Sequence, residues 1–220
     1  MRATQVIVIT KAPVPGRSKT RLSPPCTPHQ AAGIAAAAVG DTLDVVRATP
    51  VSARVVALDG PMGGLDLAGF TVVPQCEGDL GTRLAAAFAD AMPRHDVPTL
   101  LIGMDTPQVT AELLDRCAAL LEAGGPGTAV LGTAPDGGWW ALGLHAAAPA
   151  AVLADVPMSR EDTAVRTREA LEATGLTVLD LPQLTDIDHF PDALSVAALC
   201  PPDSRTARVV ASVADSLTLA

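Results

Sequence analysis

The sequence predicts an α/β fold: a three-layer sandwich with a mostly parallel, mixed central sheet. Apolar segments of strand length alternate with helix-like segments along the 220 residues, an order typical of strands joined by crossover helices. The first apolar run, residues 4–10, is continuous and β-branched rather than alternating, as expected for a strand buried on both faces. No linker or internal repeat interrupts the pattern, so we expect one domain over residues 1–200, with residues 201–220 as an extension packed on it.

Caps and turn residues place the elements of the first half. Thr27 and Pro28 offer a helix cap and a first-position proline, and the Ala-rich helix that follows suits close packing on a sheet. Glycines and a proline in residues 59–64 mark a loop, and Thr110 is a cap for the third helix. The expected strands are 4–10, 52–58, 70–73 and 99–103, and the expected helices are 28–48, one that follows residue 83 and ends near Met92, and 111–123.

The second half is punctuated in the same way. Gly-Gly-Pro-Gly at residues 124–127 ends the third helix, and residues 136–138 lead into a strand that holds both tryptophans. Pro201-Pro202 separates a last helical segment, which packs either on its own subunit or on a second copy in a homodimer. The expected strands are 128–131, 139–144 and 177–181, and the expected helices are 160–173, one that opens at 186–192 and ends near Leu199, and 204–217.

Composition argues against several classes of protein. The formal net charge is −9 and the pI is near 4.7, which argues against nucleic acid as the main partner. The four cysteines are far apart and form no C-x-x-C pair, which argues against a zinc knuckle and favours thiols in a reducing compartment. No apolar stretch is long enough to span a membrane or to act as a signal peptide, so we expect a cytoplasmic protein without a membrane partner.

A basic loop directly follows the first predicted strand. It gathers four positive charges within eleven residues of an acidic chain, and it holds the only two lysines of the sequence. Its glycine allows a ligand to approach the backbone closely, and its prolines restrict the loop before anything binds. A solvated loop without a ligand is the alternative, but the position after a buried strand favours a phosphate site. The residues expected to contact phosphate are Lys11, Pro13, Gly16, Arg17, Lys19 and Arg21.

Three carboxylates are candidate catalytic residues and ligands for Mg²⁺ or Mn²⁺. Asp105 directly follows the strand at residues 99–103, where ligands of open α/β sheets bind, and a hard cation held there would bridge diphosphate oxygens. Asp136 is a candidate second ligand. Asp186 and Asp188 share one side of an extended segment, and Asp188 could join the metal or act as a general base. Turn or helix-capping roles are the alternatives for each.

A substrate pocket is expected at the turn before the tryptophans. Gly137 and Gly138 permit a tight turn and leave space for a ligand, and Trp139 could form the wall of a sugar or base pocket. Neighbouring strand residues face opposite sides, so one of the two tryptophans is expected in the core. Arg83 lies at an earlier strand–helix connection, where it could meet a nucleotide or a neighbouring carboxylate. The expected nucleotide contacts in that connection are Gln75, Gly78 and Arg83.

Together these segments resemble the DUF2064 family of GT-A-fold proteins, whose members are often labelled glycosyltransferases. The K-A-P-V-P-G-R-S-K-T-R-L segment is close to the family signature, and the resemblance spans residues 4 to 199. It implies a nucleotide-diphospho-sugar transferase fold, with Asp105 where relatives hold metal. Residues 157–160 lack the Trp-Ser-Thr expected there. The wider superfamily includes the guanylyltransferases of molybdopterin cofactor assembly. The supporting segments are residues 11–22, 78–83, 103–107, 136–138 and 186–188.

These residues lead us to expect a metal-dependent transferase that acts on a nucleotide-diphosphate donor. In glycosyl transfer, which we favour, the donor is a nucleotide sugar and a small molecule accepts the sugar. In nucleotidyl transfer, a phosphorylated acceptor attacks the α-phosphate of a nucleoside triphosphate. A non-catalytic nucleotide-binding protein is the third hypothesis. In both enzyme hypotheses the basic loop neutralises phosphates, and the metal stabilises charge on the leaving diphosphate.

Overall fold

The computed structural model describes residues 2–219, whose strands form one sheet. The strands are β1 (Arg2–Lys11), β2 (Val51–Asp59), β3 (Thr71–Pro74), β4 (Thr99–Ile102), β5 (Thr128–Thr133), β6 (Trp139–Leu144) and β7 (Thr177–Leu181). Their order in the sheet is β3-β2-β1-β4-β6-β5-β7. Within the described chain, β6 alone runs antiparallel to its neighbours, and the other pairs are parallel. The predicted mixed, mostly parallel sheet is therefore confirmed.

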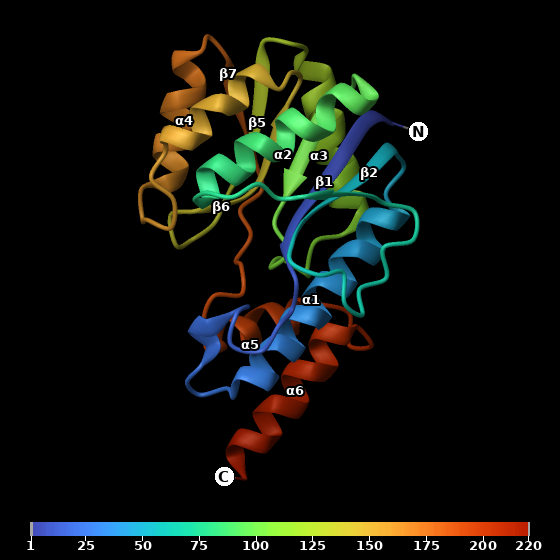
Figure 1. Ribbon diagram of the computed structural model, residues 1–220, viewed down its shortest axis with the longest axis vertical. Coiled ribbons are helices and arrows are strands. Elements are labelled where there is room, and N and C mark those ends of the chain that lie inside the picture. The colour runs from blue at the N-terminus through green and yellow to red at the C-terminus, as the bar shows by residue number, and fades with distance from the viewer. Residues whose placement is uncertain (1, 220) are drawn as a thin grey trace.

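Helices cover both faces of the sheet and complete the three predicted layers (Figure 1). One face carries α1 (Pro28–Ala48) and α3 (Ala111–Gly124), and the other carries α2 (Leu80–His95), α4 (Thr163–Ala173) and the 3₁₀ segment η2 (Ala148–Asp155). Successive residues of β1 serve the two layers in turn: Val6 and Val8 belong to the core on the α1 side, and Ile7 to the core on the α2 side. All four cysteines are free, and three are buried.

The first half of α1 extends beyond the sheet and carries a third core (Figure 1). The 3₁₀ turn η1 (Thr20–Leu22), α5 (Phe190–Leu199) and α6 (Arg205–Thr218) pack against it. Leu22, Ile34 and Ile187 are fully buried there. The last helix therefore packs on its own chain. No helix within residues 2–219 is long and apolar enough to cross a lipid bilayer.

Several predicted boundaries differ from the structure. The predicted helix 160–173 begins only at Thr163, because that side chain closes a turn instead: its hydroxyl accepts from the Arg160 N–H and donates to the Pro157 carbonyl, both at 3.0 Å. Helix α2 continues three residues past the predicted end at Met92 and includes Pro93 in its last turn. Segment η2 was not predicted. Its backbone packs so closely on α2 that a Cβ on Gly81 would lie 2.2 Å from the Leu153 carbonyl oxygen.

The strand order creates a switch point between β1 and β4. From β1 the chain builds β2 and β3 on one side, and it then returns to place β4 on the other side of β1. Ligands of open α/β sheets bind where the strand order reverses, beyond the carboxyl ends of the strands. Because β6 is antiparallel, its first residues lie at that same edge. The fold therefore brings the ends of β1, β4 and β5 and the start of β6 to one place.

Candidate active site

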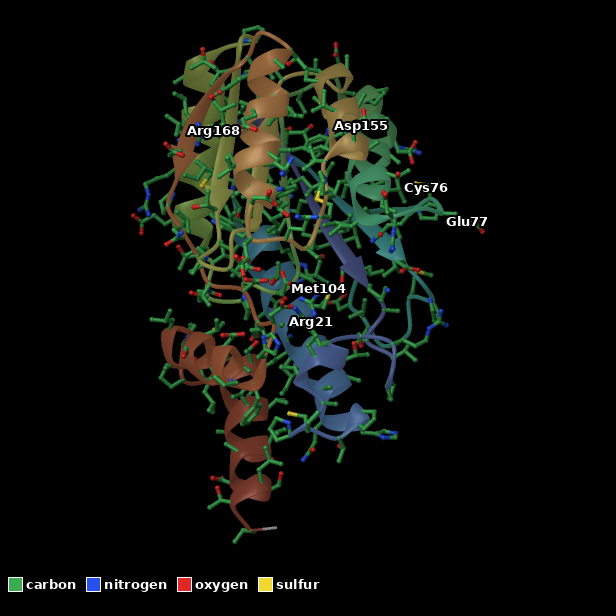
Figure 2. The ribbon with its side chains drawn as sticks, turned by 90° about the vertical axis from the view of Figure 1, so that its left-hand side faces the viewer. Arg21, Cys76, Glu77, Met104, Asp155 and Arg168 are labelled. Atoms are coloured by element: carbon green, nitrogen blue, oxygen red, sulfur yellow. The ribbon has the colours of Figure 1, made fainter. Side chains whose placement is uncertain are left out.

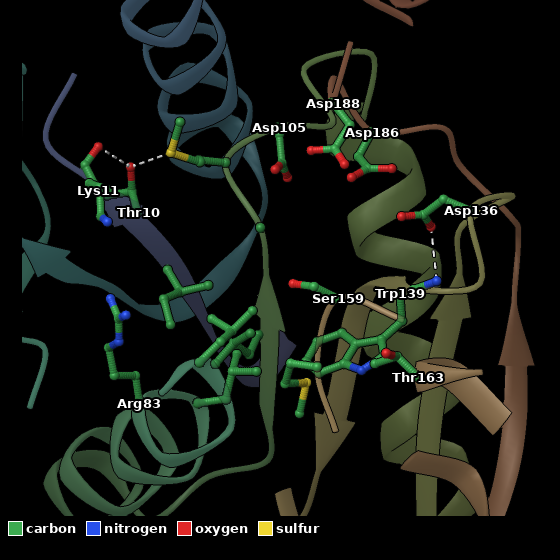
Figure 3. A pocket seen from close by; sticks show the side chains of 18 of the residues that line it. Thr10, Lys11, Arg83, Asp105, Asp136, Trp139, Ser159, Thr163, Asp186 and Asp188 are labelled. Atoms are coloured by element: carbon green, nitrogen blue, oxygen red, sulfur yellow. Dashed lines mark hydrogen bonds between the residues drawn. The ribbon is translucent and has the colours of Figure 1, made fainter. Parts of the chain in front are cut away.

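A cavity of about 430 Å³ opens at the switch point, and a second chamber of about 260 Å³ lies beside it beneath the basic loop. Both volumes are of the order of small-molecule sites. Apolar side chains of the α2-side core, Leu84, Leu101, Trp139 and Met158 among them, line part of the larger chamber. Figure 3 shows Lys11 and Arg83 on one side of this chamber and a group of carboxylates on the other. The residues that line both chambers are Lys11, Arg21, Met104, Asp105 and Asp188.

Three carboxylates form a cluster at the cavity mouth. Asp136, Asp186 and Asp188 each place one oxygen within 4.8 Å of the others. Burial, and after it the negative charges of Asp105 and Asp136, together raise the pKa of Asp186 to about 6. Hard oxygen donors of this kind suit Mg²⁺ or Mn²⁺, and a cation would relieve the repulsion that raises this pKa. The donor set therefore fits a divalent cation. Asp186 joins Asp136 and Asp188 in this cluster, and Asp105, the ligand expected from the sequence, pairs with Lys19 in the same cavity.

The segment that carries two of these carboxylates is pinned at its centre. Ile187 is fully buried, and its N–H donates to the Asp105 carbonyl at 2.9 Å. Alternate residues of an extended segment point the same way, so Asp186 and Asp188 both line the cavity. Neither residue caps α5. That helix begins at Phe190, and Asp192 accepts a hydrogen bond from the His189 N–H at 2.7 Å.

The third carboxylate of the cluster sits in the tight turn between β5 and β6. Asp136 accepts a hydrogen bond from the Gly138 N–H at 2.8 Å through Oδ1, which fixes its side chain. Gly137, predicted to leave space for a ligand, instead makes room for a neighbouring turn: a Cβ would lie 1.9 Å from the Glu161 carbonyl oxygen, and its φ is +89°. Within the described chain, Gly138 lines the cavity, whereas Gly137 does not.

The basic loop lies directly against the carboxylates. Lys19 Nζ is 2.7 Å from Asp105 Oδ2 and also donates to the Ile187 carbonyl, and Arg21 Nη1 is 2.5 Å from Asp188 Oδ2. Figure 2 shows Arg21 beside Met104 at the junction between the sheet and the helices α1, α5 and α6. The structure thus brings the basic loop and the acidic residues to one cavity mouth.

The remaining loop residues are distributed over different surfaces. Arg17 lines the smaller chamber, and within residues 2–219 it makes no ion pair. Gly16 is exposed, and its φ of +75° favours glycine. Pro13 lines a separate groove of about 460 Å³ formed by α1, α6 and the loop at residues 64–66. Among the described residues, it is not one of those that line either chamber. The predicted phosphate contact of Pro13 is therefore not supported by its position.

Asp59, which sequence reasoning missed, holds two of the predicted cations. It ends β2, and its Oδ2 lies 3.4 Å from Lys11 Nζ and 3.2 Å from Arg83 Nη1. Arg83 therefore meets the neighbouring carboxylate that was one of its two alternatives. Its Nε also donates to the Gly78 carbonyl at 3.1 Å. An aspartate directly after an apolar strand was the sequence signal, the same one that singled out Asp105.

Gln75 joins the ends of two strands. Its Nε2 donates to the carbonyls of Thr10 and Ala57, at 2.8 and 2.9 Å, so both amide hydrogens are used within the protein. The side chain still lines the cavity. Only its amide oxygen is left to contact a ligand as an acceptor.

The two tryptophans face opposite sides, as predicted. Trp139 lines the cavity, and its Nε1 donates to Thr167 Oγ1 of α4 at 3.1 Å, which fixes the plane of the indole. Trp140 is 2% exposed, and its Nε1 donates to the Pro182 carbonyl at 2.9 Å. Met104, between the two chambers, contacts Thr10 Oγ1 through its sulfur at 3.0 Å. Trp139 is therefore a rigid aromatic wall of the candidate site.

Comparison with known families identifies the chain. The sequence model of the family described as "Uncharacterized protein conserved in bacteria (DUF2064)" matches residues 42–160. This chain is a member of the DUF2064 family. The family match begins after the basic loop and ends before Asp186, so the structure alone relates those two segments to the matched region. Among curated proteins none matches the chain.

Solved structures share the fold of this DUF2064 protein. A protein from Desulfovibrio desulfuricans G20, provisionally named a nucleotide-diphospho-sugar transferase, has a TM-score of 0.83 and 22% identity over 99% of this chain and 97% of its own. A Mycobacterium tuberculosis H37Rv protein solved with manganese has a TM-score of 0.53 and 21% identity over 89% of this chain and 98% of its own. The 2-C-methyl-D-erythritol 4-phosphate cytidylyltransferase of Thermus thermophilus has a TM-score of 0.54 and 19% identity over 90% of this chain and 98% of its own. The predicted nucleotide-diphospho-sugar transferase-like fold is confirmed.

Proposed function

We propose that this DUF2064 protein is a metal-dependent transferase that moves a glycosyl group from a nucleotide-diphosphate sugar to a small acceptor. The observation that carries the proposal is the carboxylate cluster of Asp136, Asp186 and Asp188 facing the basic loop across one cavity mouth. A diphosphate ligand needs both sides of such a site, because its oxygens bind a divalent cation and also accept hydrogen bonds from basic side chains. The shared fold supports the same class of donor.

The two chambers suit different parts of the donor. The smaller one is lined by the four cations of the basic loop, which would neutralise the phosphates. The larger one offers the fixed indole of Trp139 and an apolar floor, against which a sugar or base face would pack. Met104 lies between them, so the link between phosphate and organic group would cross this side chain.

The chain's own residues hold the donor and its charge. A divalent cation bound by Asp136, Asp186 and Asp188 would stabilise the negative charge that grows on the leaving diphosphate. Lys19 and Arg21 would donate hydrogen bonds to phosphate oxygens from the loop side. Asp105, paired with Lys19, would orient that ammonium next to the cluster. Trp139 and the apolar floor would exclude water from the transferred group.

Nucleotidyl transfer is the second candidate, because the cytidylyltransferase from Thermus thermophilus shares this fold over most of both chains. The same cation and basic loop would then bind a nucleoside triphosphate, a phosphorylated acceptor would attack its α-phosphate, and pyrophosphate would leave. The two reactions would use the same site and would differ in the donor that binds there, a nucleotide sugar or a nucleoside triphosphate. The two proposals are therefore separated by which nucleotide binds and which product forms.

The test is a thermal-shift panel of nucleoside triphosphates and nucleotide sugars, with and without Mn²⁺, followed by chromatography of the products. In the variant Asp136→Asn, the amide oxygen can still accept the Gly138 N–H, so the turn is kept while the charge is removed. Asp90→Asn, on the exposed side of α2, is the matched control. We expect a nucleotide sugar to stabilise the wild type only with Mn²⁺, Asp136→Asn to lose that effect, and the control to keep it.

Each other outcome has a definite meaning. Stabilisation by triphosphates alone, with release of pyrophosphate, would favour nucleotidyl transfer. Stabilisation without any product would indicate a nucleotide-binding protein that is not an enzyme. A panel without any stabilisation, or one that is independent of Mn²⁺, would contradict the proposed metal-dependent transferase.

A further inference from the structure

The basic loop supplies counter-ions to the carboxylate cluster from within the chain. Lys19 pairs with Asp105 across 86 residues of sequence, and Arg21 pairs with Asp188 across 167. The Lys19 side chain is only 10% exposed, and it is also held by the Ile187 carbonyl. The Arg21 side chain is 56% exposed, so it can leave its partner without opening the core. The two contacts therefore differ: one anchors the loop and the other is free to exchange.

The exchangeable contact occupies a candidate cation ligand. Asp188 belongs to the cluster whose oxygens lie within 4.8 Å of one another, and its Oδ2 accepts the Arg21 guanidinium. A divalent cation at the cluster would compete for this carboxylate, and it would also repel a guanidinium in direct contact with its ligand. A phosphate in the smaller chamber offers Arg21 another acceptor, because Arg21 and Asp188 both line that chamber.

We propose that Arg21 is the internal counter-ion of the cation site and is exchanged when the ligands bind. Arg21 occupies Asp188 while the cluster is empty, and it moves to the phosphates when a divalent cation takes the carboxylate. The inference rests on the proposed function. The two ligands then favour each other: the cation frees Arg21 for the diphosphate, and the diphosphate draws Arg21 away from Asp188. Such coupling is reciprocal by thermodynamic necessity.

The experiment measures Mn²⁺ affinity of the full chain without nucleotide, by titration calorimetry or by the electron paramagnetic resonance of free Mn²⁺. Arg21→Gln removes the competing charge and keeps a side chain of similar polarity. Arg17→Gln is the matched control, since it removes the same charge from the same loop at an exposed residue that makes no ion pair within the described chain. We expect Arg21→Gln to bind Mn²⁺ about 3- to 10-fold more tightly than wild type, and the control to stay within about twofold.

The two possible roles of Arg21 predict opposite changes in Mn²⁺ affinity. If Arg21 only held Asp188 in place as a ligand, Arg21→Gln would bind Mn²⁺ more weakly, and the counter-ion role would be overturned. Equal tightening in both variants would indicate a general effect of loop charge and would overturn it too. Failure of the wild type to bind Mn²⁺ would instead overturn the cation site of the proposed function itself. Thermal melting without Mn²⁺ confirms that both variants are folded.

Discussion

Replacing Asp186 by Asn is expected to stabilise the protein when no divalent cation is present. In the folded chain, burial together with the charges of Asp105 and Asp136 raises the pKa of Asp186 from 3.8 to about 6. A carboxyl whose pKa is higher in the folded than in the unfolded chain favours folding while it is protonated. That contribution is full below the unfolded pKa and is lost as the pH rises through the folded pKa. Asn keeps the shape of the side chain without the charge.

The size of the effect follows from the shift. A pKa that is higher by about 2 in the folded chain means that ionisation of Asp186 at pH 7.5 lowers the unfolding free energy by about 3 kcal/mol. Water at the cavity mouth screens part of this interaction, so we expect a gain of about 1–2 kcal/mol for Asp186→Asn. For a chain of this size that is a rise in Tm of about 3–6 °C. At pH 4 the gain should fall to about 0.5 kcal/mol or less.

Thermal unfolding followed by circular dichroism in EDTA, at pH 7.5 and pH 4, measures both values. Asp90→Asn, on the exposed side of α2, controls for the loss of one charge. A lower Tm for Asp186→Asn at pH 7.5, or the same gain at both pH values, would refute the reasoning. The same variant should also lose its stabilisation by Mn²⁺, because it lacks one of the three carboxylates of the proposed cation site.

Two further predictions concern the supports of the site. Gly137→Ala should lower the unfolding free energy by more than about 2 kcal/mol, because its Cβ would lie 1.9 Å from the Glu161 carbonyl oxygen. Gly175→Ala, with φ +92° and open space around it, should cost only about 1 kcal/mol; equal losses in urea unfolding would contradict the packing argument. Thr167→Val removes the acceptor of the Trp139 indole N–H and should cost about 1–2 kcal/mol and weaken nucleotide binding. An unchanged Tm would show that the indole finds another partner.

Local chemistry in the sequence was enough to place most elements. The uninterrupted β-branched run of β1 is buried as predicted, because helices cover both faces of the strand and neither face contacts water. Thr27 accepts the Gln30 N–H and Thr110 accepts the Leu113 N–H, since a cap needs only residues three positions apart. The opposite directions of the two tryptophans followed from the same short-range rules, and the mostly parallel character of the sheet followed from the alternation of strands and helices.

Local chemistry failed where two distant segments share one space. Gly137 could be given a turn conformation from its neighbours, but its missing side chain matters because of Glu161. Asp59 was overlooked because its importance comes from Lys11 and Arg83, and its neighbours in the sequence do not reveal either contact.

By itself the sequence determined the α/β class, most of the elements, and the character of a basic loop followed by acidic turns. The tertiary structure decided which charges meet: Lys19 with Asp105, Arg21 with Asp188, and Asp186 with Asp136 and Asp188 in the carboxylate cluster. The physical reason is the strand order. Periodicity and capping act over a few residues, whereas the neighbours of β1 and β4 are set by which faces can be buried together across the whole sheet.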